Sequence, residues 1–282
     1  MLNCTNMNNE NFDIQGHRGC RGLLPENSLE AFEKALEIGV TTLEMDVVVS
    51  GENRLIVSHE PYISKEICDI PDSIPQNSDK LNIYKMDHGQ IRNFDCGTKF
   101  NPRFPEQKKI KTYKPTLTEV IELAKSFSEK NNTPPVHFNI ETKCIPETDN
   151  IYHPEPNEFA ELLIQTIKKH GLTDRFTLQS FDIRTLQYAH ENHPEVEIAL
   201  LIENVKPFEE NIAELGFKPD IYSPDFELLN AQDIENLHEQ NIRVISWTVN
   251  EKDDMINLIN WGIDGIITDY PNRLTEVLTE IK

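Results

Sequence analysis

The sequence predicts an α/β fold in which a parallel sheet closes into a (β/α)8 TIM barrel. The chain has 282 residues, a length that is typical of this barrel. Short apolar runs typical of β-strands alternate with stretches that carry apolar residues at helical spacing, and eight such pairs follow one another. Strands that alternate with helices form parallel sheets with right-handed crossovers, and eight strands close the barrel.

An open, doubly wound sheet is the structural alternative. That fold carries a glycine-rich loop after its first strand, with glycines at a characteristic spacing. Here the first predicted strand ends in Gly16-His17-Arg18-Gly19, which lacks that spacing. The closed barrel is therefore the favoured prediction.

Each predicted strand is a short, mostly apolar run that ends in polar residues. These strands span residues 13–19, 41–49, 136–142, 175–181, 197–202, 220–226, 243–249 and 265–269. The predicted helices between them span residues 27–38, 116–130, 155–170, 183–192, 208–215, 231–239, 251–260 and 271–281. In the first helix, Asn27 is the expected N-cap with Glu30 three residues on, and Gly39 is the expected stop.

One region, from about residue 60 to residue 114, breaks this alternation because it is polar and rich in proline, asparagine and lysine. We expect an insertion after the second strand, and we expect residues 1–12 to form a tail before a single barrel domain, 13–282. The insertion either forms a lid or wall of a pocket or packs around a small core of its own. Its aromatic residues are Tyr62, Tyr84, Phe94, Phe100, Phe104 and Tyr113.

The charge of the chain limits the classes of partner that it can bind. There are 48 acidic and 27 basic residues, which gives a net charge of -21. Nucleic acids and anionic membrane surfaces are excluded as main partners, because binding to either depends on an excess of basic side chains. An anionic ligand would need local positive charge, which a metal ion together with Arg18 and Lys143 could supply.

The cysteines indicate neither a zinc knuckle nor a disulfide framework, because no CxxC spacing occurs and their number is odd. They are Cys4, Cys20, Cys68, Cys96 and Cys144. We expect reduced thiols, with a single bridge as the open alternative.

The first 15 residues are polar and contain neither the basic nor the apolar region of a signal peptide. No run of eighteen apolar residues occurs, so we expect no membrane-spanning helix. These features leave the compartment open: cytoplasmic, or periplasmic if a signal peptide has been removed.

Polar side chains gather where three neighbouring predicted strands end, and at the end of a short apolar run, 55–59. They are His17, Arg18, Glu44, Asp46, His59, Glu141 and Lys143. Glu44 and Asp46 differ by two positions, as do Glu141 and Lys143, so each pair faces one side of its strand. In a TIM barrel the active site lies at this carboxyl edge.

These residue types suit metal-assisted chemistry on a phosphate ester. Three carboxylates in a small space repel one another unless a cation lies among them, and oxygen ligands favour Ca²⁺ or Mg²⁺ over Zn²⁺. Arg18 and Lys143 can bind phosphate oxygens, and His17 and His59 can move protons.

Some further residues near the strand ends could belong to the site or could only stabilise the local structure. Gln179 and Trp247 either line the pocket, where they would contact substrate, or satisfy local packing. Glu26 and Asn27 fit a turn and a helix cap, and Asp269 fits a brace for the last loop.

The order of these motifs resembles the glycerophosphodiester phosphodiesterase family. The matching segments are His17-Arg18, Pro25-Glu26-Asn27, Glu44-x-Asp46, His59, Glu141-x-Lys143, Trp247–Asn250 and Asp264–Pro271. The resemblance spans residues 13–281, and it implies a TIM barrel that hydrolyses glycerophosphodiesters to glycerol 3-phosphate and an alcohol with one divalent cation, often Ca²⁺ or Mg²⁺.

The same resemblance implies roles for individual residues. Glu44, Asp46 and Glu141 match the metal ligands of the family, and His17 and His59 match its acid/base pair. Arg18 matches its phosphate contact, and Lys143 matches the basic residue beside the metal. Two other functions stay open: a phospholipase D-like cleavage of lysophospholipids, and a binding module for a phosphate ligand that has no catalytic activity.

Overall fold

The computed structural model describes residues 12–75, 78 and 81–281, and within them eight parallel strands close into a barrel. The strands are β1 (Asp13–Gly16), β2 (Thr42–Val49), β4 (His137–Thr142), β5 (Phe176–Ser180), β6 (Glu197–Ile202), β7 (Ile221–Pro224), β8 (Arg243–Ser246) and β9 (Gly265–Thr268). Neighbours along the chain pair in order, and β1 pairs with both β2 and β9, which closes the sheet. The predicted TIM barrel is confirmed.

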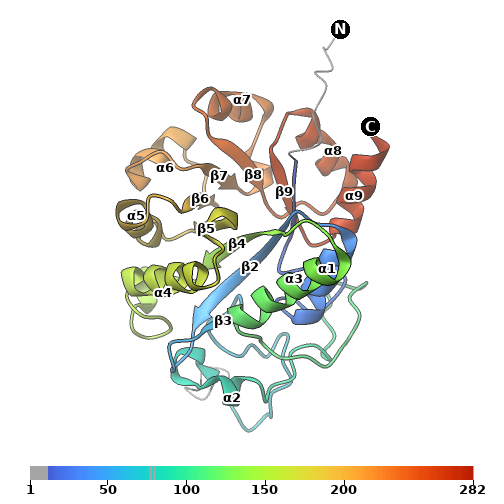
Figure 1. Cartoon of the computed structure of the whole chain (residues 1–282), viewed down its shortest axis with the longest axis vertical. Helices are drawn as coiled ribbons and strands as arrows, with labels where there is room; N and C mark the ends of the chain where they lie inside the picture. Colours follow the sequence, from blue (N-terminus) through green and yellow to red (C-terminus); the bar gives the residue numbers. More distant parts are fainter. Residues whose placement is uncertain (1–11, 76–77, 79–80, 282) are drawn as a thin grey trace.

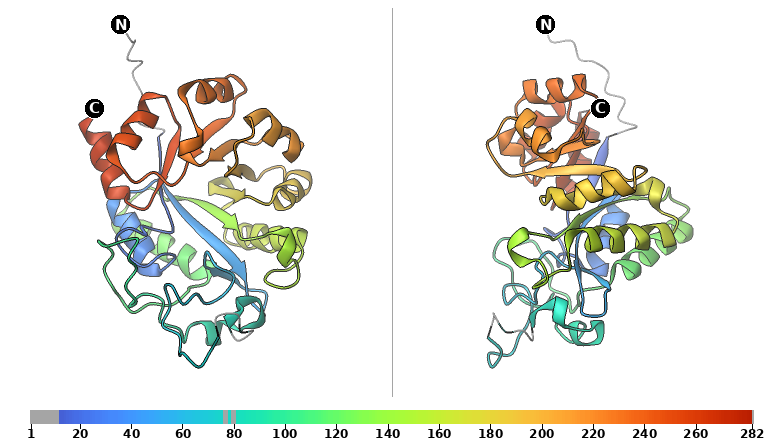
Figure 2. Two further views of the ribbon diagram at one scale, coloured as in Figure 1. Left: turned by 180° about the vertical axis from the view of Figure 1, so that it is seen from behind. Right: turned by 90° about the vertical axis from the view of Figure 1, so that its left-hand side faces the viewer.

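Helices surround the barrel on its outer side, as Figures 1 and 2 show. They are α1 (Leu29–Ile38), α3 (Leu117–Asn131), α4 (Pro156–Lys169), α5 (Ile183–Asn192), α6 (Phe208–Leu215), α7 (Ala231–Glu239), α8 (Lys252–Asn260) and α9 (Pro271–Glu280). Short 3-10 turns, η3 to η6, span Ile83–Lys85, Pro146–Thr148, Thr173–Arg175 and Phe226–Leu228. Among the described helices, none is both long and apolar enough to cross a lipid bilayer.

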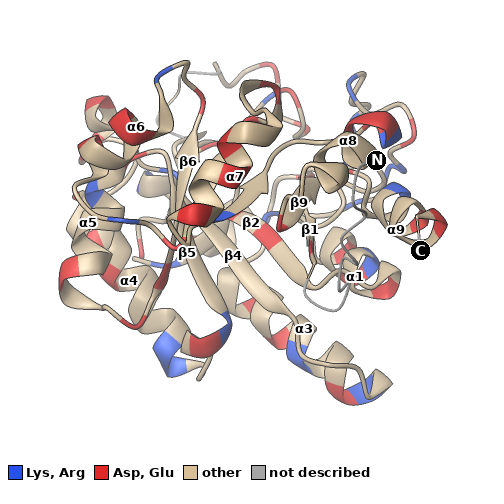
Figure 3. Ribbon diagram, turned by 90° about the horizontal axis from the view of Figure 1, so that it is seen from above, with Lys and Arg blue, Asp and Glu red and all other residues tan. Residues whose placement is uncertain are grey.

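Helix α4 illustrates how the apolar spacing of the sequence becomes packing. Phe159, Leu163, Ile164 and Ile167 recur at helical spacing, and all four are buried between the helix and the barrel. Each such side chain contributes about 1.5–3 kcal/mol to the folding free energy through the apolar area it buries. The opposite faces of the outer helices carry acidic residues, which Figure 3 shows on α4, α5 and α6.

The start of α1 differs from the prediction. Ser28, not Asn27, is the N-cap, and its hydroxyl accepts a hydrogen bond from the Ala31 amide at 3.1 Å. Asn27 has a φ of 55°, and its side chain points to the barrel instead. Gly39 ends the helix with a φ of 94°, as predicted.

The insertion leaves the barrel through β3 (Leu55–Val57), which pairs with β2 in antiparallel fashion. Its described part contains η3 and the single-turn helix α2 (His88–Ile91), and it lies beside β3 in Figure 1. It packs around its own core, formed by Val48, Ile56, Ile63, Cys68, Ile70, Leu81, Ile83, Met86, Ile91 and Cys96. Of the two predicted roles of the insertion, a lid or wall of the pocket and a segment with its own small core, the structure favours the second.

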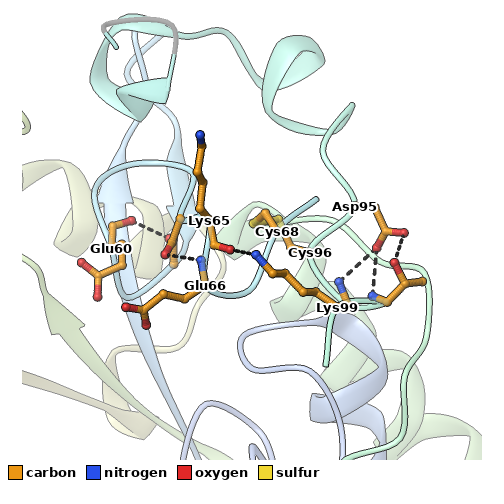
Figure 4. The surroundings of a disulfide bond; sticks show 11 residues. Glu60, Lys65, Glu66, Cys68, Asp95, Cys96 and Lys99 are labelled. Carbon is orange, nitrogen blue, oxygen red and sulfur yellow. Dashed lines mark hydrogen bonds between the residues drawn. A yellow bond between two sulfur atoms is a disulfide. The ribbon is translucent and has the colours of Figure 1, made fainter. Parts of the chain in front are cut away.

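Two cysteines of this core, Cys68 and Cys96, form a disulfide (Figure 4). The Lys99 ammonium group donates a hydrogen bond to the Lys65 carbonyl oxygen and links the same two segments. The expectation of reduced thiols is therefore wrong for this pair, because the fold brings together two cysteines that lie 28 residues apart. Cys20 and Cys144 are free and buried, and Cys4 lies outside the described residues.

Candidate active site

A cavity of about 270 Å³ opens at the carboxyl ends of the barrel strands. The predicted site residues that line it are His17, Arg18, Glu44, His59, Glu141, Lys143, Gln179 and Trp247. Asp46 is buried beside Glu44 and Glu141. The structure thus brings all nine predicted site residues to one place.

The three carboxylates converge because of the register of two strands. Asp46 on β2 is the direct partner of Glu141 on β4, and Glu44 faces the same side of β2 as Asp46. One oxygen from each of Glu44, Asp46 and Glu141 lies within 4.8 Å of the others, and all three residues are buried.

The electrostatics of this group favour a cation. Burial raises the pKa of Glu44 well above its usual range, and the Asp46 carboxylate beside it acts in the same direction. Burial also opposes ionisation of Asp46, but Arg18 and His59 hold its pKa well below its usual range. Asp46 Oδ1 is buried and accepts no hydrogen bond. An all-oxygen set in which one buried oxygen accepts no hydrogen bond fits a hard divalent cation such as Ca²⁺ or Mg²⁺.

Lys143 lies directly beside the carboxylates. Its ammonium group is 2.6 Å from Glu141 Oε1 and 3.8 Å from Asp46 Oδ1. Although burial opposes its charge, Glu141 and Asp46 raise the pKa of Lys143, so it is cationic. It is therefore a fixed positive charge at the edge of the cavity.

His17 is held by a carboxylate that sequence reasoning interpreted only as a loop brace. Its Nδ1 lies 2.8 Å from Asp269 Oδ1, and Asp269 is also paired with Arg21 at 2.7 Å. Because Asp269 accepts the Nδ1 proton, His17 Nε2 faces the cavity without a proton, 4.0 Å from Glu44. Burial, followed by Arg21, lowers the pKa of His17 to about 4, so its ring is neutral at pH 7.

His59 follows β3 and is more open to solvent, with 31% of its side chain exposed. The amide of Ser58 donates to the Asp46 carbonyl oxygen at 3.0 Å, which fixes the chain beside the carboxylates. His59 Nδ1 lies 2.8 Å from Glu60 Oε1, so each of the two histidines has its own carboxylate partner.

Arg18 lies in the turn after β1 with a φ of 50°, a left-handed conformation that turns its amide inward. That amide donates to Glu44 Oε2 at 2.9 Å, while the guanidinium lies 3.0 Å from Glu26 and 3.1 Å from Asp46. Asn27 donates to Asp46 Oδ2 at 2.9 Å. Glu26 and Asn27 therefore support the site residues, which the turn-and-cap interpretation missed.

Gln179 and Trp247 both line the cavity. The amide of Gln179 donates to Glu44 Oε1 at 2.7 Å and accepts from Asn139 at 3.0 Å, so it orients a carboxylate. The Trp247 indole donates to the Ser223 carbonyl oxygen at 2.9 Å, which fixes its ring at the wall.

Sequence reasoning did not single out several residues near the cavity. Arg21 is in a loop with no periodic signal, whereas Glu60 could have been found as the acidic neighbour of His59. Phe181 and Glu203 also line the cavity, and each directly follows a strand, at the carboxyl edge where site residues are expected.

A second group of potential metal ligands, Cys144, Asp149 and His153, lies beyond β4. Its members already have partners. Both oxygens of Asp149 are paired with Arg184, and burial raises the pKa of the Cys144 thiol. His153 Nδ1 lies 2.8 Å from the Pro154 carbonyl oxygen. This group fits a metal less well than the carboxylates in the cavity.

Residues 17–273 match the sequence profile of the Glycerophosphoryl diester phosphodiesterase family. The chain belongs to this family. The resemblance stated from the motifs alone is thereby confirmed for nearly the whole chain.

Several known proteins are similar to this chain over most of their length. A glycerophosphodiester phosphodiesterase from Caldanaerobacter subterraneus subsp. tengcongensis is 27% identical, with 94% of this chain and 97% of that protein covered. One from Bacillus subtilis is 26% identical over 93% of this chain and 84% of its own. A lysophospholipase D from Rattus norvegicus is 24% identical, and the match covers 94% of this chain and 85% of that protein.

Solved structures share the fold. The structure of a putative glycerophosphoryl diester phosphodiesterase from Silicibacter pomeroyi superposes with a TM-score of 0.83 at 24% identity, covering 96% of this chain and 94% of the other. A phosphodiesterase from Oleispira antarctica, solved in complex with the product sn-glycerol-3-phosphate, gives a TM-score of 0.75 at 21% identity, covering 95% and 96%.

Proposed function

We propose that this chain hydrolyses glycerophosphodiesters to glycerol 3-phosphate and an alcohol, and that residues 13–282 form one catalytic domain with the insertion at about 60–114. The convergence of three carboxylates, two histidines and two basic side chains on one cavity carries the proposal. Relatives that span most of this chain are glycerophosphodiester phosphodiesterases, and the similar Oleispira antarctica structure holds sn-glycerol-3-phosphate.

Glu44, Asp46 and Glu141 would hold one divalent cation, Ca²⁺ or Mg²⁺. When bound, such a cation offsets the negative charge that develops on the phosphate oxygens in the transition state. The observation that supports the site is the buried Asp46 Oδ1, which accepts no hydrogen bond from the described residues and has only the Lys143 ammonium group, at 3.8 Å, as an ion-pair partner.

Arg18 and Lys143 bind the phosphate and orient it. The Nε and Nη1 atoms of Arg18 are engaged by Asp46 and Glu26, which leaves Nη2 free to donate to a phosphate oxygen. Lys143 adds a positive charge on the adjacent wall, next to Glu141. Both side chains are held by carboxylates, so they lose little conformational entropy when they bind substrate.

His17 and His59 act as the acid/base pair. One accepts the proton of the nucleophile, and the other donates a proton to the leaving alkoxide. In each histidine, Nδ1 is within hydrogen-bonding distance of a carboxylate, so Nε2 is the nitrogen left to exchange a proton in the reaction. Because the two must begin in opposite protonation states, the rate should be bell-shaped in pH.

Two routes fit this arrangement. The nucleophile is either the 2-hydroxyl of the glycerol, which gives a cyclic phosphate that water then opens, or water itself. A diester that lacks the 2-hydroxyl distinguishes them: cleavage at full rate would exclude the cyclic route, and loss of cleavage with retained binding would support it.

The central test measures release of glycerol 3-phosphate from glycerophosphocholine by the purified protein, with EDTA and after Ca²⁺ or Mg²⁺ is added back. We expect turnover that disappears with chelator and returns with one cation. The same turnover should be lost in His17→Ala and in His59→Ala, with cation binding retained. If these variants keep full activity, the acid/base assignment is wrong.

Lysophospholipids are the second substrate class to test, because the matched relatives include lysophospholipase D. Lysophosphatidylcholine replaces glycerophosphocholine in the same assay. A folded protein that cleaves the lysolipid but not the water-soluble diester would refute the proposed substrate class, and no cleavage of either would favour a binding module.

A further inference from the structure

The cavity has two chemically different walls. The ends of β1, β2 and β4 supply the carboxylates and basic residues of the proposed phosphate site. On the other side, the ends of β5, β6 and β8 supply Phe181, Glu203 and Trp247. Because β5 and β6 lie across the barrel from β1, a diester bound by its phosphate can extend across the cavity to this second wall.

Glu203 is the carboxylate of this second wall. Among the residues that the structure describes, it makes no ion pair and its side chain makes no hydrogen bond. The nearby Lys206 is paired with Glu214 and does not neutralise it. The cationic residues that line the cavity with it, Arg18, Arg21 and Lys143, are paired with other acids. Glu203 therefore presents an uncompensated negative charge to whatever fills this end.

Phe181 and Trp247 place aromatic rings at the same end. The rings pack edge to face, with centroids 5.5 Å apart and planes at 89°. The indole of Trp247 is anchored by its hydrogen bond to Ser223. Phe181 is 39% exposed and lines the cavity, so its ring is accessible from that space.

We propose that Glu203, Phe181 and Trp247 form a subsite for an alcohol that carries an ammonium group, so that the enzyme selects zwitterionic glycerophosphodiesters. Aromatic faces and one carboxylate are the groups that bind quaternary ammonium ions in proteins. A second anionic group would be repelled by Glu203, and a neutral alcohol would gain nothing from its charge. This inference rests on the proposed phosphodiesterase function.

The test compares two substrates that differ only in charge. One is glycerophosphocholine, and the other is the diester of 3,3-dimethylbutanol, in which a carbon atom replaces the ammonium nitrogen. We expect the wild-type protein to prefer the choline diester by about tenfold in kcat/KM, a typical effect for one exposed cation site. The difference should lie in KM, because the ammonium group takes no part in the chemical step.

Two variants assign the preference to these residues. Glu203→Gln should lower kcat/KM for the choline diester about threefold more than kcat/KM for the neutral diester. Phe181→Leu keeps an apolar wall but removes the aromatic face, and it should have a similar selective effect. Rising ionic strength should reduce the preference of the wild type more than that of Glu203→Gln.

Glu210→Gln is the matched control, because Glu210 is an exposed acid on α6 that does not line the cavity. If it changes the preference as much as Glu203→Gln does, the overall negative charge, not a subsite, attracts the cation, and the proposal is overturned. Equal losses on both substrates, or no preference in the wild type, would also overturn it while the phosphodiesterase function stands. Absence of hydrolysis of both diesters would overturn both.

Discussion

At the scale of single residues, Asp269 does not line the cavity, but it holds two residues that do, His17 and Arg21. Its carboxylate accepts from His17 and Arg21 and also from the amide of Asn250, at 2.8, 2.7 and 2.9 Å. Although burial opposes its ionisation, His17 and Arg21 hold the pKa of Asp269 far below its usual range. It is therefore a permanent anion that fixes the tautomer of His17.

We predict that Asp269→Asn lowers kcat about 10²-fold, as is typical when the orienting partner of a functional histidine is lost. KM for glycerophosphocholine should change much less, because the phosphate contacts are intact. Steady-state kinetics and circular dichroism on the purified variant check this. Glu276→Gln, which removes an exposed acid from α9, is the control and should be as active as the wild type. A fully active Asp269→Asn would show that His17 needs no such partner.

The buried carboxylate of Glu26 should make the free energy of unfolding depend on pH. Burial opposes its ionisation, but Arg18 and Arg21 lower its pKa from 4.5 to about 2. A carboxylate whose pKa is lower in the folded state contributes stability above its unfolded pKa of 4.5, and this stability is lost as the pH falls toward 2. The full contribution is about 3 kcal/mol.

Denaturant unfolding of wild type and Glu26→Gln, with chelator present, measures this contribution. The stability difference between the two proteins should shrink by about 2 kcal/mol between pH 6 and pH 3. A difference that does not depend on pH would mean that Glu26 is not held ionised by the two arginines.

At the scale of elements, the insertion is a small structural unit attached to β2 and β3. It has its own apolar core and a disulfide between Cys68 and Cys96. Of the described residues that line the cavity, none comes from the range 60–114. Its contribution to the fold and its contribution to catalysis should therefore be separable.

The double variant Cys68→Ser/Cys96→Ser should be less stable by about 3 kcal/mol, because the bridge closes a loop of 28 residues. Its kcat on glycerophosphocholine at 25 °C should stay within about twofold, a difference below 0.5 kcal/mol in the barrier. Thermal unfolding of both proteins with and without reductant is the measurement, and reductant should destabilise only the wild type. Unchanged stability would show that the disulfide does not form in the protein in solution.

At the scale of the whole molecule, the barrel holds three carboxylates close together, and this lowers the stability of the folded state. Without a cation, Glu44, Asp46 and Glu141 repel one another in a buried space. A ligand that binds only the folded protein stabilises it by mass action, about 2.7 kcal/mol when its concentration is 100 times the dissociation constant.

Ca²⁺ or Mg²⁺ at saturating concentration should therefore raise the thermal midpoint of the wild type by about 5 °C. Asp46→Asn should abolish the shift in the thermal midpoint. It removes one of the three proposed ligands and one of the two carboxylate charges that lie beside Lys143. Asp149→Asn, in the second group of potential ligands, is the control and should retain it. A shift that survives Asp46→Asn but not Asp149→Asn would place the cation in the second group of potential ligands, beside Asp149, and would contradict the proposed site.

The sequence alone determined the barrel, since strand-like runs that alternate with amphipathic helices leave few other topologies. It also determined the candidate residues at the strand ends, because Glu44 and Asp46, like Glu141 and Lys143, are two positions apart and face one side of a strand. Local signals were less reliable at Asn27, where both Asn27 and Ser28 suit an N-cap and tertiary contact with Asp46 decided between them.

Only the tertiary structure decided which residues from distant parts of the chain meet. Asp269 reaches His17 across 252 positions, and Gln179 reaches Glu44 across 135, because barrel closure sets β9 beside β1 and directs the β2 and β5 side chains to one interior. Cys68 and Cys96 meet in the separate core of the insertion, and Glu203 lines the same cavity as Phe181 and Trp247 because their strands end at one edge of the barrel. Periodicity along a chain predicts which face a residue occupies, whereas partners across a fold depend on strand register and closure, which no local pattern encodes.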